Sequence, residues 1–291
     1  MRNKRHKGLT TVLLCLGIIL VTVSSCGFLP EDEDKVDKDG MTLVWQDEFD
    51  SDTVTTQSNW AHEIWPKGKV NDEKQDYINS TETAYVSDGT LKIRAYKEEN
   101  GNWHSARLRT ENASGSRSWK YGYFEAKLKM PKGNGVWPAF WMMPHDPSGN
   151  SGDKGAYGGW PCSGELDIME YSPSTTGNRL YATVHYGTDW NTGHRYTSLG
   201  GKNISDATSE WHVYGLRWTD EYVEAFIDDV SLGTKYYNDR KGEEATWPYD
   251  QKFYIILNLA MGGTLGGSID PNLTEAIYEI DYVRVYQVKL K

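Results

Sequence analysis

Residues 164–170 read Gly-Glu-Leu-Asp-Ile-Met-Glu and combine an apolar strand pattern with three carboxylates. Successive side chains of a β-strand point to opposite faces, so Glu165 and Asp167 share one face and Glu170 falls on the other. All three acids share a face only if one extra residue is inserted between Asp167 and Glu170, which is what a β-bulge does. The stretch therefore predicts a strand with a bulge at Ile168–Met169, its three acids on one side and its apolar residues facing a core.

The sequence on both sides of this stretch shows further strand signals. Residues 123–130 alternate apolar and polar side chains, and clusters of Gly, Asn and Asp separate one such run from the next. No internal repeat, linker or sustained helical period interrupts the pattern. The expected strands are 42–45, 91–96, 121–130, 180–185, 212–218, 222–227, 253–259 and 278–288. Residues 42–288 are therefore predicted to form one all-β domain, a sandwich of two antiparallel sheets.

Three acids on one face indicate a particular kind of chemistry. Like charges oppose ionisation and raise one another's pKa. That suits a retaining glycosidase, which needs one ionised carboxylate and one protonated carboxylic acid about 5–5.5 Å apart. The alternative is a solvated acidic strand edge. An aromatic content of 13% favours the glycosidase, because exposed flat rings beside polar groups are typical of a sugar-binding groove.

Further motifs accompany the acidic strand. They are Asp-Glu-Phe at 47–49, Trp-Pro-Ala-Phe-Trp-Met at 137–142, Trp-Pro-Cys-Ser at 160–163, Leu-Asn-Leu-Ala-Met-Gly-Gly at 257–263 and Asp-Tyr-Val-Arg-Val-Tyr at 281–286. With these motifs the chain resembles glycoside hydrolase family 16, in the branch of laminarinases and related β-1,3- and mixed-linkage glucanases. The resemblance extends over about residues 42–288. It implies a β-jelly-roll with an open substrate cleft.

The resemblance also implies an activity and roles for individual residues. The activity is that of a retaining endo-β-glucanase acting on β-1,3- or mixed β-1,3/1,4-linked glucans. Glu165 would be the nucleophile, Glu170 the acid/base and Asp167 the helper of the nucleophile. The implied substrate-binding residues are Trp137, Trp141, Trp160, His185 close to the acid/base, Arg109 and Asn71. For each tryptophan a core position is the alternative, and for His185 a structural role.

A metal site is suggested only by the resemblance to the family. No His/Cys cluster has the spacing of a zinc site. The family implies no cofactor for catalysis, but its members often hold a structural calcium ion on the convex side. Its ligands would be Glu48, Gly89 and Asp281, the first two largely through backbone oxygens. A fold without calcium is the alternative.

The N-terminus carries the features of an export signal. Four basic residues lie within the first seven, and residues 9–23 are apolar apart from threonine. This run is shorter than the roughly twenty residues of a bilayer span. Val-Ser-Ser-Cys at 23–26 resembles the bacterial lipobox, which predicts a signal peptide over residues 1–25 and lipidation of Cys26. An ordinary signal peptide or a retained membrane anchor is the alternative.

Residues 26–41 are expected to be a disordered acidic tether. An acidic run after a lipidated cysteine resembles the surface-export signal of Bacteroidetes lipoproteins, so an outer-membrane lipoprotein at the cell surface is predicted. A solubilising spacer is the alternative. The expected partners are a β-glucan and, through the lipid, the membrane. The protein is expected to be a monomer.

Charge narrows the set of partners. Residues 1–25 carry four basic and no acidic side chains, so their removal lowers the formal net charge from −10 to −14. Such a chain is a poor candidate for nucleic acid. Two alternative functions remain open. One is the same mechanism on a red-algal galactan such as agar, porphyran or carrageenan, against which the charge argues mildly because sulfated glycans favour basic clefts. The other is a surface glycan-binding protein without catalysis, which would lack one of the two glutamates.

Overall fold

The computed structural model describes residues 38, 40–50, 59–111, 117–146, 154–239 and 246–288. The predicted signal peptide, Cys26 and most of the predicted tether lie outside these residues. All of the described residues belong to one compact unit that comprises residues 37–291. The two helices in the described ranges are single turns, α1 (Pro173–Thr176) and α2 (Gly263–Gly266). No helix in these ranges is long and apolar enough to cross a membrane.

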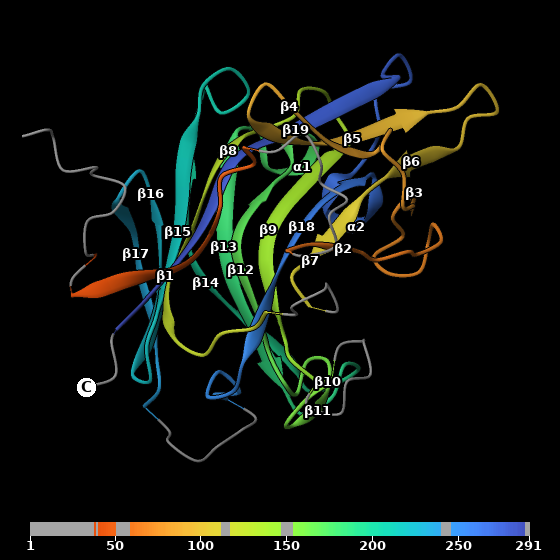
Figure 1. Cartoon of the computed structure of the whole chain (residues 1–291). Helices are drawn as coiled ribbons and strands as arrows, with labels where there is room; N and C mark the ends of the chain where they lie inside the picture. Colours follow the sequence, from red (N-terminus) through yellow and green to blue (C-terminus); the bar gives the residue numbers. More distant parts are fainter. Residues whose placement is uncertain are drawn as a thin grey trace, which may run out of the picture. The chain divides into compact units, whose positions relative to one another are not determined.

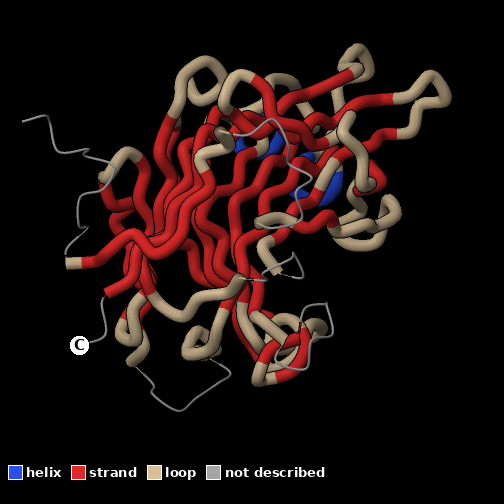
Figure 2. Tube along the Cα trace, viewed as in Figure 1, coloured by secondary structure: helices blue, strands red, loops and turns tan. Residues whose placement is uncertain are grey.

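Two large sheets make up the described domain (Figures 1 and 2). One has ten strands and runs in the order β17 (Val230–Tyr237), β16 (Tyr222–Ile227), β15 (His212–Trp218), β8 (Gly122–Lys129), β19 (Glu275–Val288), β5 (Thr90–Lys97), β6 (Trp103–Ser105) and β3 (Gln75–Tyr77), with β1 (Met41–Asp47) beside β19 and β4 (Ala84–Ser87) beside β5. Its pairs are antiparallel except β3 with β6.

The second sheet has seven strands and carries the acidic stretch. Its order is β14 (His194–Asn203), β13 (Arg179–Gly187), β12 (Glu165–Tyr171), β9 (Val136–Pro144), β18 (Phe253–Met261), β7 (Arg107–Arg109) and β2 (Ala61–His62). The short strands β10 (Lys154–Gly155) and β11 (Gly158–Gly159) form a separate hairpin before β12. β12 therefore lies inside the sheet, with β13 on one side and β9 on the other.

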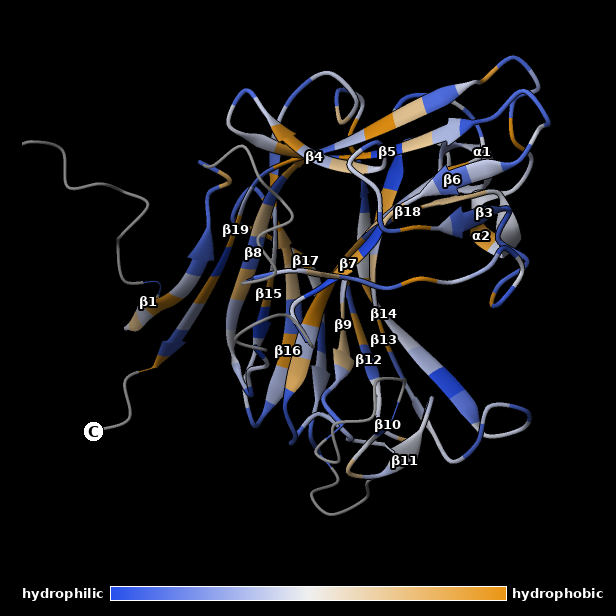
Figure 3. Ribbon diagram, turned by 45° about the vertical axis from the view of Figure 1, so that its right-hand side comes forward, coloured by the Kyte–Doolittle hydropathy of each residue, from blue (hydrophilic) through white to orange (hydrophobic). Residues whose placement is uncertain are grey.

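The core lies between the two sheets. Phe124, Ala126 and Leu128 of β8 are fully buried, as are Leu166 and Val184 of the other sheet, and all five belong to one apolar cluster. Apolar and polar residues alternate along many of the strands (Figure 3). Most strands therefore give one face to the core and the other to the surface, whereas β18 is buried on both faces. The prediction of an all-β sandwich of two sheets is confirmed.

Every strand expected from the sequence is present, and β15 and β16 have the expected bounds. The sequence did not indicate β14 or β17. β14 reads His-Arg-Tyr-Thr-Ser-Leu-Gly-Gly-Lys-Asn, in which apolar and polar residues do not alternate. Most of its residues are exposed or half-buried, so no apolar face is needed. It is a strand because its backbone pairs with β13 from Arg179 to Gly187. Long-range pairing, which local sequence does not report, determines this edge of the sheet.

The predicted bulge in β12 is confirmed. Opposite β13, Asp167 pairs with Thr183 and Glu170 with Tyr181, so three steps along β12 match two steps along β13. The pairing with β9 shifts at the same place. Ile168 and Met169, where the extra residue is inserted, are both buried. Glu170 therefore points to the same face as the two acids before the bulge.

Candidate active site

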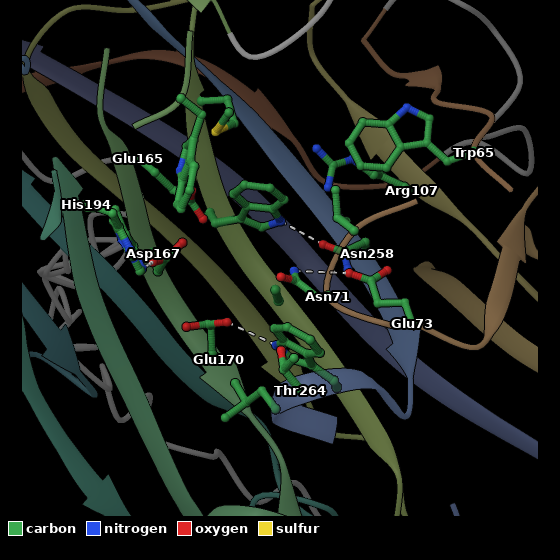
Figure 4. A pocket seen from close by; sticks show the side chains of 18 residues that line it. Trp65, Asn71, Glu73, Arg107, Glu165, Asp167, Glu170, His194, Asn258 and Thr264 are labelled. Atoms are coloured by element: carbon green, nitrogen blue, oxygen red, sulfur yellow. Dashed lines mark hydrogen bonds and ion pairs between the residues drawn. The ribbon is translucent and has the colours of Figure 1, made fainter. Parts of the chain in front are cut away.

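A cleft of about 420 Å³ lies on the face of the seven-stranded sheet that is turned away from the core (Figure 4). The side chains that line it come from β7, β18, β9, β12, β13 and β14 and from the loops beside them. They are Trp65, Val70, Asn71, Glu73, Arg107, Trp137, Ala139, Trp141, Met143, Trp160, Glu165, Asp167, Glu170, His185, His194, Asn258, Thr264 and Leu265.

The three acids of β12 lie together in this cleft. Glu165 and Glu170 are half-buried, whereas Asp167 between them is only 2% exposed. Ligand atoms of Glu165, Asp167 and His185 all lie within 4.8 Å of one another. The bulge turns Glu170 toward the same cleft, so three carboxyl groups share one partly desolvated site.

An indole N–H contacts each of the two glutamates. Nε1 of Trp160 donates to Oε2 of Glu165, and Nε1 of Trp137 donates to Oε1 of Glu170 over 3.0 Å. Nε1 of Trp141 donates to Oδ1 of Asn258 over 2.6 Å. All three tryptophans line the cleft and none of them is fully buried. Hydrogen bonds therefore hold the rings in place while part of each ring surface faces the cleft.

His185 connects the acids to the edge strand. Its Nε2 lies 3.0 Å from Oδ2 of Asp167, and its Nδ1 lies 2.8 Å from Nε2 of His194. Burial lowers the pKa of His185, but the hydrogen bond and charge of Asp167 and the charges of both glutamates outweigh it and raise that pKa to about 9. His185 was expected close to the acid/base; it interacts with the charge of Glu170, and its direct contact among the acids is with Asp167.

The environment of Glu170 and Asp167 favours their protonated forms. Burial raises the pKa of Glu170, the charge of Glu165 adds to this, and the N–H of Trp137 and the charge of His185 oppose it. Burial raises the pKa of Asp167 well above its ordinary value, and the charges of Glu165 and Glu170 add to it against the opposing effect of His185. A protonated carboxylic acid can therefore persist near neutral pH, as a general acid requires.

The opposite end of the cleft is built around Arg107. Its guanidinium carbon lies 4.2 Å from the ring centroid of Trp65 and 4.5 Å from that of Trp141. Figure 4 shows Trp65 and Arg107 at the end of the cleft away from Glu165. Glu63 pairs with Nε of Arg107 and with Nη1 of Arg109. These contacts hold the guanidinium of Arg107 against both indole rings at this end.

Arg109 was expected from the resemblance to contact the substrate. Arg107 and Arg109 are both buried, and of the two only Arg107 lines the cleft. The two residues are two positions apart on β7 and share a face, so the alternation of side chains along a strand does not distinguish them. Pairing with β18 distinguishes them, because Arg107 lies opposite Asn258 and Arg109 lies further along, opposite Ile256.

Asn71 lines the cleft as expected. Its backbone adopts a positive φ of 52°, and its carbonyl accepts a hydrogen bond from Thr264 N over 2.8 Å. Its Nδ2 donates to Oε1 of Glu73 over 3.4 Å. The sequence did not single out Trp65, Glu73, Arg107, His194 or Asn258. Of these, Asn258 lies in a motif that supported the family resemblance, and the others reach the cleft only through strand pairing and loop contacts.

Comparison with known proteins agrees with this geometry. The sequence profile of glycosyl hydrolases family 16 matches residues 71–284. A Rhodothermus marinus beta-glucanase is 37% identical over 260 residues, which cover 84% of this chain and 85% of that protein. A non-specific endo-β-1,3(4)-glucanase of known structure is 30% identical with a TM-score of 0.74, covering 87% of this chain and 94% of that one. A Z. galactanivorans protein solved with laminaritriose and laminaritetraose is 35% identical with a TM-score of 0.71, covering 84% and 99%.

Proposed function

This chain belongs to glycosyl hydrolase family 16, and we propose that it is a retaining endo-β-glucanase that hydrolyses β-1,3- or mixed β-1,3/1,4-linked glucans. One observation carries the proposal. The bulge of β12 places Glu165, Asp167 and Glu170 on the same face of one cleft, with an indole N–H on each glutamate. A carboxylate to attack and a carboxylic acid to donate a proton are the two groups that retention requires.

The reaction proceeds in two steps. The carboxylate of Glu165 attacks the anomeric carbon and forms an ester, while protonated Glu170 donates its proton to the departing glycosidic oxygen. Glu170, now ionised, removes a proton from water, which attacks the anomeric carbon and releases Glu165. Two inversions at one carbon give a product of unchanged anomeric configuration.

The residues around the acids support these roles. The N–H of Trp160 orients the carboxylate of Glu165 before attack. The N–H of Trp137 stabilises ionised Glu170 after it has given up its proton. Asp167, whose surroundings favour its protonated form, adds little negative charge beside Glu165. The nucleophile can therefore ionise while Glu170 keeps its proton.

The substrate follows from the cleft and the relatives. The cleft presents four tryptophans and one arginine, which fit the apolar faces and hydroxyls of neutral sugars. The relatives named beta-glucanase and endo-β-1,3(4)-glucanase support a β-glucan over a red-algal galactan. Both glutamates are present, which argues against a glycan-binding protein without catalysis.

A panel digestion tests the proposal. Laminarin, curdlan, barley β-glucan, lichenan, xyloglucan and agarose are incubated with the enzyme and with its Glu165→Gln variant. We expect release of oligosaccharides from one or more of the first four, and no release by the variant. Activity on none of the six, or full activity of Glu165→Gln, would refute the function. Proton NMR of the first product distinguishes retention from inversion, and an inverted anomer would refute the two-step mechanism alone.

A structural calcium ion is part of the proposal. β1 and β5 both pair with the edge of β19 that faces away from β8. β1 pairs with β19 from Val288 down to Val283, and β5 pairs with it from Glu275 up to Ile280. This leaves a break in the pairing beside Asp281. Glu48 follows β1 at this break, and Gly89 lies in the turn before β5. This register supports the proposed ligand set, because all three positions belong to the segments that border the break.

The side chains at this place are compatible with the expected ligands. Both carboxylate oxygens of Glu48 pair with Arg284, at 2.8 and 2.9 Å, so Glu48 would contribute its backbone oxygen. Oδ2 of Asp281 lies 2.8 Å from Nζ of Lys127, and calcium would compete with this lysine. The ion would join β1 to β19 and take no part in the chemistry.

Location and assembly remain predictions from the sequence. Cys26 lies outside the described residues, as does the signal peptide before it. We propose a lipid anchor on Cys26, an outer-membrane lipoprotein at the cell surface and a monomeric catalytic domain. The lipobox-like sequence and the acidic run after it support the anchor and the location.

A further inference from the structure

Neither the proposed chemistry nor the core explains the exposed Tyr196. Its side chain is 67% exposed, and it lies on β14, the edge strand of the seven-stranded sheet. It pairs directly with His185 of β13, which pairs in turn with Glu165 of β12. Directly paired residues of antiparallel strands point to the same face. Tyr196 therefore faces the side of the sheet that carries the cleft.

Tyr196 continues a row of rings that starts at the nucleophile. Trp160, whose N–H donates to Glu165, lies 4.6 Å from His194 between ring centroids. His194 lies 6.3 Å from Tyr196, and His185 lies 6.0 Å from it. The rings follow one another from Glu165 to the edge of the sheet, where β14 is the outermost strand.

The neighbouring tyrosine shows that this exposure is specific to one face. Tyr186 is the next residue after His185 and points to the opposite face, where its ring stacks on Tyr236 at 5.1 Å and packs against the core. Tyr196 gains no such burial. An aromatic ring that is left in water beside a sugar-binding cleft indicates a binding surface.

We propose that Tyr196 is the stacking platform of an additional sugar subsite at the β14 end of the cleft. β14 lies two strands from β12, roughly 10 Å away at the usual strand spacing, which a glycan spans with about two sugar units. The subsite would therefore bind a pyranose about two units from the scissile bond. The inference rests on the proposed function, since it assumes that a β-glucan occupies the cleft.

Cleavage of laminarihexaose in ¹⁸O-labelled water tests the subsite. Mass spectrometry of the labelled reducing ends shows which bond is cut, and hence how the substrate was positioned. Tyr196→Ala is expected to lower kcat/KM roughly tenfold and to shift cleavage away from the bonds whose cutting places a sugar on Tyr196. Tyr196→Phe, which keeps the ring, should retain both the rate and the pattern.

Tyr237→Ala is the matched control. Tyr237 is 56% exposed and lies on the edge strand β17 of the other sheet, so its loss should change neither kcat/KM nor the distribution of cleaved bonds. An unchanged pattern in Tyr196→Ala would overturn the subsite, whether the rate stays the same or falls for every bond alike. Wild-type activity on laminarihexaose is measured first. Its absence, together with inactivity on the other β-glucans, would count against the proposed function and not against Tyr196 alone.

Discussion

Glu170 is the residue whose surroundings most directly control the proposed reaction. It must be protonated to act, so activity is lost when the pH rises through its pKa. Burial raises this pKa, and the N–H of Trp137 is the main opposing influence because it stabilises the ionised form. The alkaline limb of the pH profile should therefore respond to the loss of this hydrogen bond.

Replacing Trp137 with phenylalanine removes that hydrogen bond and keeps an aromatic ring. Since the carboxylate loses a donor, the pKa of Glu170 should rise further. The alkaline limb of kcat/KM is expected to move to higher pH by about one unit, the size of a charge-assisted hydrogen bond. The measurement is kcat/KM against pH on a soluble β-glucan.

Trp141→Phe provides the matched comparison for this experiment. Trp141 also lines the cleft, but its N–H donates to Asn258 instead of an acid. This variant should bind substrate less well while its alkaline limb stays in place. A downward shift for Trp137→Phe, or equal shifts for both variants, would contradict the role assigned to Glu170.

At the scale of single elements, the entry into β12 determines where the acids lie. Gly164 precedes the strand with a φ of +82°, and a Cβ placed on it would lie 2.7 Å from Pro248 and 2.8 Å from the ring of Tyr249. The hydroxyl of Tyr249 donates to the carbonyl of His185 over 2.7 Å. A side chain at position 164 that displaces Tyr249 would therefore also disturb His185 on the neighbouring strand β13.

Gly164→Ala is expected to lower the free energy of unfolding by about 2–4 kcal/mol, from the left-handed backbone and the crowding together. Urea unfolding followed by tryptophan fluorescence measures it. Gly159→Ala is the control, because a Cβ there meets nothing within 4 Å and should change stability by less than about 0.5 kcal/mol. Equal stability of the two variants would show that the turn before β12 relaxes freely.

At the scale of the whole domain, both ends of the described chain meet at one place. β1 and β19 pair from Met41↔Val288 to Asp47↔Val283, and the proposed calcium position follows this pairing. An ion bound only by the folded state stabilises it by mass action. Calcium would thus act on the stability of the entire domain, although the cleft lies on the other sheet.

Chelation should therefore lower the melting temperature. At a free calcium concentration of 100 Kd the ion adds about 2.7 kcal/mol, which corresponds to roughly 5–10 °C for a domain of this size. Differential scanning calorimetry with EDTA and with excess calcium measures the shift. Asp281→Asn should respond much less than the wild type. An identical melting temperature with and without calcium would remove the ion from the proposal.

The sequence by itself determined the features that depend on local periodicity. Alternation with a period of two predicts strands with one buried face, and hence the sandwich. The same period applied to Glu165, Asp167 and Glu170 requires the bulge, because no regular strand places all three on one side. These inferences succeed because side-chain direction along a strand is a property of neighbouring residues.

Only the tertiary structure decided which residues beyond the predicted tryptophans, His185 and Asn71 line the cleft with the acids. Arg107 and not Arg109 lines the cleft because of its register with β18. Tyr196 faces the same side as Glu165 because β14, a strand without an apolar pattern, pairs with β13. Strand order and register are set by backbone hydrogen bonds between segments far apart in the chain, and a one-residue slip would turn every side chain to the other face. The acids could therefore be identified from the sequence, whereas the surface on which the proposed sugar chain lies required the fold.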